Sequence, residues 1–160
     1  MPRITMAPAN GYLRQMQIIR YQPTHKQACL RVFVSNVGRY FADYEQAEFA
    51  EFLEGDALTS DYFVGLLDEQ IVACGGFAPR GERVVMTWGM VQREWHSQGL
   101  GRQLTEHRLS LISQRFPKLA VELETSQHTQ GFYAKQGFRV LKVTKDGFAA
   151  GIDLVSMRRD

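Results

Sequence analysis

Two glycines separated by a single residue, Gly99 and Gly101, lie where an apolar run ends and a helical pattern begins. The first N–H groups of a helix have no intrahelical partner, and the helix start carries a partial positive charge. Glycine also lacks the Cβ that would keep an anion at a distance. The spacing therefore predicts a turn that binds a pyrophosphate through main-chain N–H groups, although a purely structural turn has the same local pattern. The residues expected to contribute are Ser97, Gln98, Gly99, Leu100, Gly101 and Arg102.

Two acidic residues, Glu122 and Glu124, alternate with apolar ones, so both project from the same face of a predicted strand. Glu124 is nearer the carboxyl end of that strand, where we expect a cleft to open. It is the preferred candidate for a general base or for a group that recognises a cationic substrate, while solvated sheet residues would show the same alternation. His96 and His128 are further candidates, because histidine side chains commonly act as general acids or bases. The four histidines are scattered along the chain and indicate no metal site.

The composition indicates one domain. The chain has 160 residues, of which 44% are hydrophobic and 11% aromatic, enough to bury one core but not two. Its 19 basic and 17 acidic residues are mixed along the sequence, which argues against a nucleic-acid-binding or membrane-binding surface. Cys29 and Cys74 lie in apolar stretches without metal-binding spacing, which predicts two buried free thiols. Without a membrane-spanning run of ~20 apolar residues or a signal-peptide core, we expect a cytoplasmic protein.

Hydrophobic periodicity predicts the elements that must position these residues. Strands are expected at residues 17–21, 61–67, 71–77, 84–92, 119–125, 139–144 and 152–157. Helices are expected at residues 25–37, at 41–55, from the glycine turn to Pro117, and in a short segment through Tyr133 that Thr125 or Ser126 caps. The third helix places Leu104, Arg108, Leu111 and Ile112 on the sheet. Residues 79–82 form a turn, and Asp146 and Gly147 lie in the last loop. This order predicts a mixed α/β fold with one long sheet.

The order of elements and two spacings resemble those of the GNAT superfamily of acyl-CoA-dependent N-acyltransferases. The spacings are Val91-x7-Gly99-x-Gly101 and Phe132-Tyr133-x3-Gly137-Phe138, and the resemblance extends over about residues 17–158. It implies a three-layer α/β fold with a mostly antiparallel sheet of about seven strands and four helices, splayed at two central parallel strands. Residues 1–14 would then be an N-terminal extension, and residues 15–160 the acetyltransferase domain.

The sequence departs from the family pattern at three places. His96 stands where the phosphate loop of the family has Gln or Arg. Ser126 and Thr129 stand where the second signature has Asn and Ala, seven and four residues before the tyrosine. No acid lies between Val84 and Gln92, where many members carry a glutamate that removes the amine proton through water. These departures leave the base and the contact from position 126 to the cofactor arm open.

The resemblance also assigns roles to residues. The pantetheine arm of acetyl-CoA would pair with the backbone of Gly89, Met90 and Val91, and a glycine inside an apolar strand independently indicates a bulge. Tyr133 would protonate the departing thiolate, and a backbone N–H near Met90 or Val91 would bind the oxyanion. Ser126 would lie near the cofactor arm. The acceptor pocket would be walled by aromatic residues, namely Phe33, Tyr40, Phe41, Tyr44, Trp88 and Phe148.

The predicted function is therefore direct transfer of the acetyl group of acetyl-CoA to a primary amine. The acceptor would be a small molecule, a protein N-terminus or a lysine, and the protein a monomer or homodimer. Two alternatives remain. One is a catalytically silent acyl-CoA-binding module of the same fold, and the other is an interaction domain that binds no CoA.

Overall fold

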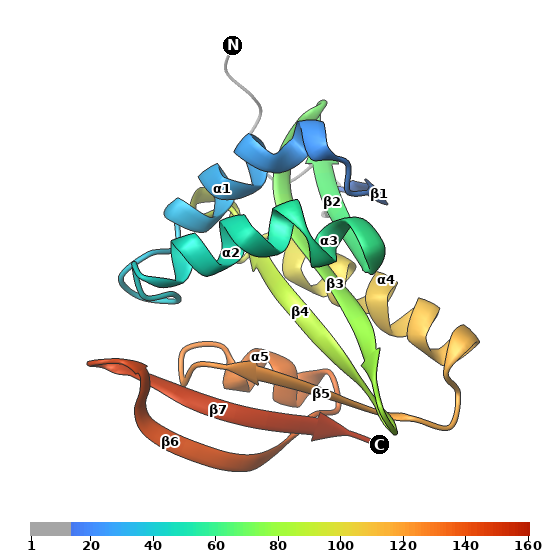
Figure 1. Cartoon of the computed structure of the whole chain (residues 1–160), viewed down its shortest axis with the longest axis vertical. Coiled ribbons are helices and arrows are strands. Elements are labelled where there is room, and N and C mark those ends of the chain that lie inside the picture. Colours follow the sequence, from blue (N-terminus) through green and yellow to red (C-terminus); the bar gives the residue numbers. More distant parts are fainter. Residues whose placement is uncertain (1–13) are drawn as a thin grey trace.

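The computed structural model describes residues 14–160, so most of the predicted N-terminal extension lies outside the described residues (Figure 1). The strands are β1 Gln17–Arg20, β2 Asp61–Leu67, β3 Gln70–Arg80, β4 Arg83–Val91, β5 Ala120–Thr125, β6 Arg139–Ala149 and β7 Ile152–Arg159. The helices are α1 Lys26–Val34, α2 Glu45–Glu54, α3 Asp56–Thr59, α4 Leu100–Arg115 and α5 Gln130–Lys135, with 3-10 turns at Pro23–His25 and Arg93–Trp95. None of the described helices is long and apolar enough to cross a membrane.

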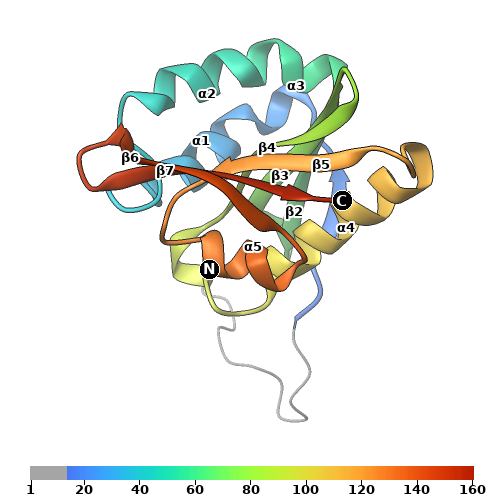
Figure 2. The same cartoon turned by 90° about the horizontal axis from the view of Figure 1, so that it is seen from below.

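The strands form one sheet in the order β1-β2-β3-β4-β5-β7-β6. All neighbouring strands are antiparallel except β4 and β5. Helices α1, α2 and α3 cover one face of the sheet and α4 and α5 the other (Figure 2). The predicted three-layer mixed α/β fold is confirmed, with the single-turn helix α3 as an addition to the four helices expected from the sequence.

The two parallel strands are paired over a short length only. Arg83–Val85 of β4 pair with Ala120–Glu122 of β5, and beyond this point the two strands diverge (Figure 1). The later part of β4 is therefore hydrogen-bonded to β3 on one side, and no strand of residues 14–160 pairs with it on the other. The backbone N–H and C=O groups of this edge that no other described residue contacts are available to a ligand that lies along it.

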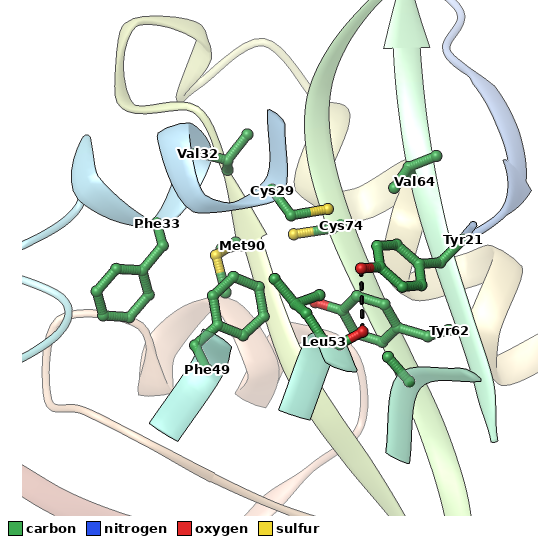
Figure 3. Close-up of a cluster of buried hydrophobic side chains, with 11 residues drawn as sticks. Tyr21, Cys29, Val32, Phe33, Phe49, Leu53, Tyr62, Val64, Cys74 and Met90 are labelled. Carbon is green, nitrogen blue, oxygen red and sulfur yellow. Dashed lines mark hydrogen bonds between the residues drawn. The ribbon is translucent and has the colours of Figure 1, made fainter. Parts of the chain in front are cut away.

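The core between the sheet and α1 and α2 is rich in aromatic side chains (Figure 3). Tyr21 and Tyr62 are buried there, and the Tyr21 hydroxyl donates a hydrogen bond to the carbonyl oxygen of Leu53, 3.1 Å away. Cys29 and Cys74 are buried free thiols, as predicted. Their sulfur atoms point toward each other, and the interaction with Cys74, together with burial, raises the pKa of the Cys29 thiol.

Three local predictions are wrong. Strand β3 continues through Pro79 and Arg80, which were expected in a turn. Asp146 and Gly147 lie in an irregular part of β6, and the turn comes later, at residues 150–151. Helix α5 begins at Gln130 after Thr129, so neither Thr125 nor Ser126 is its N-cap.

Candidate active site

A cavity of about 1040 Å³ opens where β4 and β5 diverge. Its walls come from both strands, from the start of α4, from α5, and from the start of α2 and the segment before it. Residues far apart in the sequence meet here because the parallel pairing stops at Val85 and Glu122. The carboxyl ends of splayed parallel strands are the usual ligand-binding position of an open α/β sheet.

A β-bulge shapes the edge of β4 that faces this cavity. Cys74 pairs with Met90 and Gly76 with Thr87, so two residues of β4, Trp88 and Gly89, lie opposite the single residue between Cys74 and Gly76. Trp88 adopts a left-handed backbone with φ of 40°, which is uncommon for a bulky residue. The hydroxyl of Tyr62 donates a hydrogen bond to the Trp88 carbonyl oxygen at 2.7 Å and holds the bulge from the α1–α2 side.

The predicted glycine turn forms the start of α4. Gly99 is the residue before the helix and has φ of 81°, and Ser97 has φ of 63°. Within the described chain, no backbone hydrogen bond uses the N–H groups of Ser97, Gln98 or Gly99, and the first residues of a helix lack intrahelical acceptors. The structure therefore leaves these backbone N–H groups available as donors to a ligand.

Gly101 lies in the same turn, at the second position of α4. A Cβ placed on Gly101 would meet its nearest neighbour, the Phe132 ring, at an ordinary 3.6 Å. The fold itself thus does not require glycine here. The absent side chain instead leaves the N–H groups open to an anion, which is the fit expected for a phosphate-bearing ligand.

Tyr133 and Phe132 reach the cavity from α5. The ring of Tyr133 is held between Phe132 and Phe138, with centroids 5.0 and 5.8 Å away and both partners in edge-on geometry. Its hydroxyl forms no hydrogen bond with any residue that the structure describes. A fixed ring with a free hydroxyl is suited to donating a proton to a ligand.

The two glutamates of β5 differ in their surroundings. Glu122 is ion-paired with Arg83 at 3.0 Å and with Arg158 at 2.9 Å. Glu124 is exposed and lines the cavity, and its carboxylate has no hydrogen bond or ion pair within the described residues. The carboxylate of Glu124 is therefore the one that is available to an acceptor.

Comparison with known proteins agrees with this geometry. A family model described as "Acetyltransferase (GNAT) domain" matches residues 25–160. The chain belongs to the GNAT family. No curated protein matches the sequence significantly.

Solved structures show the same fold at low sequence identity. An acetyltransferase assigned to the GNAT family, from Desulfovibrio desulfuricans, has a TM-score of 0.76 and 20% identity, covering 91% of this chain and 98% of its own. The ribosomal-protein-S18-alanine N-acetyltransferase from Escherichia coli has a TM-score of 0.74 and 18% identity, covering 91% and 93%. An aminoglycoside 6'-N-acetyltransferase complexed with coenzyme A has a TM-score of 0.71 and 14% identity, covering 90% and 96%. GNAT domains bind acyl-CoA, and the cavity has the unused donors that such a ligand needs.

Most of the site residues predicted from the sequence line the cavity of this GNAT domain. They are Tyr40, Trp88, Gly89, Met90, Val91, Ser97, Gly99, Gly101, Arg102, Glu124, Ser126 and Tyr133, together with Phe41 and Phe148. Gln98 and Leu100 do not line it, and only their N–H groups lie in the glycine turn. Phe33 is completely buried in the core, and Tyr44 is exposed and donates a hydrogen bond to the Phe148 carbonyl oxygen at 2.6 Å. Neither Phe33 nor Tyr44 lines the cavity.

The structure gives His96 a role that the sequence left open. Its Nε2 lies 2.8 Å from the carbonyl oxygen of Val91, and the side-chain amide of Asn36 donates to the same oxygen at 2.9 Å. The Tyr40 ring packs edge-on against His96, with centroids 5.1 Å apart. These contacts tie the glycine-turn segment and the end of α1 to the last residue of β4.

Sequence reasoning missed Asn36, Glu45 and Arg108 as cavity residues. Asn36 lies in the irregular connection between α1 and α2, and Glu45 is the first residue of α2. Hydrophobic periodicity does not predict the direction of side chains in such a connection. Arg108 carried a detectable signal, because it is a charged residue in the apolar stripe of a helix. Such a residue is rarely buried without a function or a partner.

Proposed function

We propose that this GNAT domain transfers the acetyl group of acetyl-CoA directly to a primary amine. The observation that carries the proposal is that two features line the same cavity. They are the unused N–H groups at the start of α4 and the bulged open edge of β4. Acetyl-CoA supplies an acyl group already activated as a thioester. The chain must then bind the donor, hold the acceptor against the carbonyl carbon and manage two protons.

Donor binding is assigned to the main chain of the glycine turn and of β4. The N–H groups of Ser97 to Arg102 would hold the pyrophosphate. The backbone of Gly89, Met90 and Val91 would pair with the amides of the pantetheine arm as an added strand, through groups other than the Val91 carbonyl oxygen, which Asn36 and His96 already contact. Ser126 is buried at the cavity wall, where its hydroxyl accepts a hydrogen bond from the His128 N–H at 3.2 Å, so its contact with the arm would be through the oxygen or the nearby backbone.

Proton transfer is assigned to Glu124 and Tyr133. The amine nitrogen forms a bond to the acyl carbon as the carbon–sulfur bond breaks. Glu124 accepts the proton that the amine loses, directly or through water, and Tyr133 donates a proton to the thiolate. The bulge N–H groups near Met90 are the proposed donors to the carbonyl oxygen that becomes negative. Each of these residues lines the cavity.

The acceptor is proposed to be an amine on a small molecule or a protein. Among proteins of this fold, one acts on an alanine of ribosomal protein S18 and another on aminoglycosides. In this chain Tyr40, Phe41 and Trp88 give the cavity an aromatic wall, which suits an apolar or cation-bearing amine. Phe148 extends this wall from the β6–β7 side.

Thermal unfolding with and without acetyl-CoA tests the binding step. A ligand at 100 times its dissociation constant adds about 2.7 kcal/mol to the free energy of unfolding, so the unfolding temperature should rise. Gly101→Asp places a Cβ and a negative charge among the N–H groups and should abolish the rise. Gly131→Asp is the matched control, since Gly131 is exposed on α5 with no heavy atom within 4 Å of an added Cβ. An equal loss of the shift in both variants would contradict the assignment.

Release of free thiol from acetyl-CoA across a panel of amines and peptides tests the transfer. Turnover with any acceptor supports the enzyme. Binding without turnover on a broad panel would instead support a catalytically silent acyl-CoA-binding module, which the missing acid on β4 also fits. If acetyl-CoA does not raise the unfolding temperature at all, both the enzyme and the silent binding module are excluded.

A further inference from the structure

We propose that Arg108 forms a carboxylate-binding subsite in the wall of the cavity, and that the domain prefers acyl-CoA donors whose acyl group ends in a carboxylate. This inference rests on the donor binding of the proposed function, because it assumes that an acyl-CoA lies along β4, and it makes acetyl a less preferred acyl group than one with a terminal carboxylate. It concerns the acyl group, which the glycine turn and the backbone edge do not select.

Arg108 is a buried cation without a counter-ion. Its side chain is among the largest that are fully buried, and the residue is 2% exposed. No acidic side chain of residues 14–160 is ion-paired with it. Its one hydrogen bond runs from Nη1 to the carbonyl oxygen of Gly76 at 3.3 Å, and Nε has no partner among the described residues. Removing a guanidinium from water without pairing it is costly, so an anionic partner from outside the chain would offset that cost.

The guanidinium lies against the β4 bulge. A Cβ placed on Gly89 would be 2.7 Å from Nη2 and 3.0 Å from Nη1 of Arg108, and a Cβ on Gly75 would be 3.2 Å from the central guanidinium carbon. Two glycines thus make room for the arginine head group directly beside the backbone where the thioester is proposed to bind. Arg108 itself lines the cavity, next to Leu104 and Thr105 on the same face of α4.

Arg108 also lies on the donor side of the sheet. It projects from α4, the helix whose first residues form the glycine turn, and Leu100 to Arg108 span ~12 Å along the helix axis. The acceptor wall of Tyr40, Phe41 and Trp88 lies on the other side of the sheet, where Phe41 and Trp88 pack against the core under α1 and α2. A ligand whose phosphates bind at the start of α4 and whose arm follows β4 therefore brings its acyl end toward Arg108.

The geometry selects a carboxylate as the matching group. A guanidinium presents a planar fork of donors that pairs with a carboxylate through two hydrogen bonds, which are stronger than those between neutral groups. An acetyl group ends in a methyl and leaves these donors unpaired. In a donor such as a succinyl thioester, the amine still displaces the thiolate at the thioester carbon. The distal carboxylate and Arg108 both keep their charge and take no part in bond making.

Binding of succinyl-CoA and butyryl-CoA to the wild-type protein tests this subsite without any mutation. Both acyl groups have four carbons, and they differ by the terminal carboxylate. We expect succinyl-CoA to bind at least about tenfold more tightly by calorimetry, the size of one charge-assisted hydrogen bond. Equal affinity, or tighter butyryl-CoA binding, would overturn the proposal even if no Arg108 variant folds.

Variants then identify the residue responsible. Arg108→Met should bring the two affinities together, and Arg108→Lys should retain part of the preference. Arg115→Met is the control, because Arg115 lies on the same helix but pairs at the surface with Asp61 at 2.9 Å. A preference that survives in Arg108→Met, or a uniform loss for both donors in that variant, would leave Arg108 as a brace for the bulge and refute the subsite. Absence of binding by any CoA thioester, acetyl-CoA included, would instead refute the proposed function itself.

Discussion

Tyr133 and Glu124 face the same cavity from different elements and carry different chemistry. The Tyr133 ring is fixed by two aromatic neighbours, so its hydroxyl has a defined position. The Glu124 carboxylate has no partner among the described residues and is exposed, so it can move toward an acceptor or a water molecule. A fixed acid beside the donor and a mobile base beside the acceptor fit the two proton transfers of the proposed reaction.

Tyr133→Phe keeps the ring and its packing and removes only the hydroxyl. Turnover should fall by ~10²–10⁴, the usual cost of losing one general acid, while the affinity for acetyl-CoA should change little because the proposed phosphate contacts are main-chain. Tyr21→Phe is the matched control, since it removes a buried hydroxyl bonded to Leu53 away from the cavity. It should lower the free energy of unfolding by about 1 kcal/mol and leave turnover unchanged. Nearly full turnover in Tyr133→Phe, with the chemical step rate-limiting, would contradict the assignment.

The environment of the Glu45 carboxylate should make the free energy of unfolding depend on pH. It lines the cavity at the start of α2, and its carboxylate accepts a hydrogen bond from the Ala42 N–H at 2.9 Å. Burial raises the pKa of Glu45 above its ordinary value of 4.5, and the nearby Glu48 adds to the rise. The folded protein therefore binds this proton more tightly than the unfolded chain, so the stability that Glu45 contributes is present at low pH and is lost as pH rises through the folded-state pKa.

Glu45→Gln should reveal this dependence. The amide can still accept the hydrogen bond from Ala42 but does not ionise. The free energy of unfolding of the variant, measured with urea relative to wild type, should rise from acidic to neutral pH. A difference that stays constant or falls over this range would show that the Glu45 carboxylate is not disfavoured in the folded state.

Residues of the site could be predicted from the sequence where their neighbours are local. The glycine turn and Tyr133 belong to short spacings that fix both element type and orientation, and both line the cavity. The contact of Asn36 with the Val91 carbonyl oxygen could not be predicted, because the two residues lie 55 positions apart in the sequence. Arg108 likewise contacts a carbonyl 32 positions away. Such contacts depend on the sheet order, which periodicity does not specify.

At the scale of elements, the bulge in β4 depends on one missing side chain. Gly89→Ala would place a Cβ 2.7 Å from Nη2 and 3.0 Å from Nη1 of the buried Arg108, so either the guanidinium or the bulge has to move. Overpacking of this kind costs ~1–3 kcal/mol, and it displaces either the bulge or the Arg108 side chain that packs against it. We therefore expect a lower free energy of unfolding in urea and reduced turnover.

The control for Gly89→Ala is Gly131→Ala. Gly131 lies in α5 with no heavy atom within 4 Å of an added Cβ, so alanine should be neutral or stabilise by up to ~1 kcal/mol. If Gly89→Ala proves as stable and as active as wild type, the close contact between the bulge and Arg108 has no consequence for either property.

Most elements followed from periodicity, and the errors have physical causes. Pro79 lies in β3 beyond Phe77, the last residue paired with β2, so its missing N–H faces an edge without a partner strand. Asp146 has φ of 53° and its carboxylate accepts a hydrogen bond from the Gly151 N–H, which makes it a turn-like residue inside β6. Proline and an Asp-Gly pair predict turns from local preference, and an edge position overrode that preference here.

At the scale of the whole molecule, the sheet consists of two halves joined at a narrow end. Strands β1 to β4 form one half and β5 to β7 the other, and between them only Arg83–Val85 and Ala120–Glu122 are paired. The cavity occupies the space beyond this junction. The fold therefore depends on the junction to hold the donor edge of β4 and the glutamates of β5 at a fixed separation.

Glu122 lies at this junction and links three strands. Its carboxylate pairs with Arg83 of β4 and Arg158 of β7, and its side chain is 24% exposed. Ion pairs in a network at a partly buried site contribute more than isolated surface pairs. Glu122→Gln should lower the free energy of unfolding by roughly 1 kcal/mol, with a smaller loss at high salt because screening already weakens these pairs in the wild type.

Glu106→Gln is the comparison for Glu122→Gln, because it also removes one carboxylate from an arginine pair. Glu106 pairs with Arg102 within α4 at 2.8 Å, joins no two elements and is 54% exposed. Urea unfolding should distinguish the two variants, with the larger loss in Glu122→Gln. Acetyl-CoA should restore part of the stability of Glu122→Gln, since a ligand that contacts β4 and α5 bridges the same two halves. Equal losses in the two variants would mean that the three-residue pairing holds the halves together without the ion pairs.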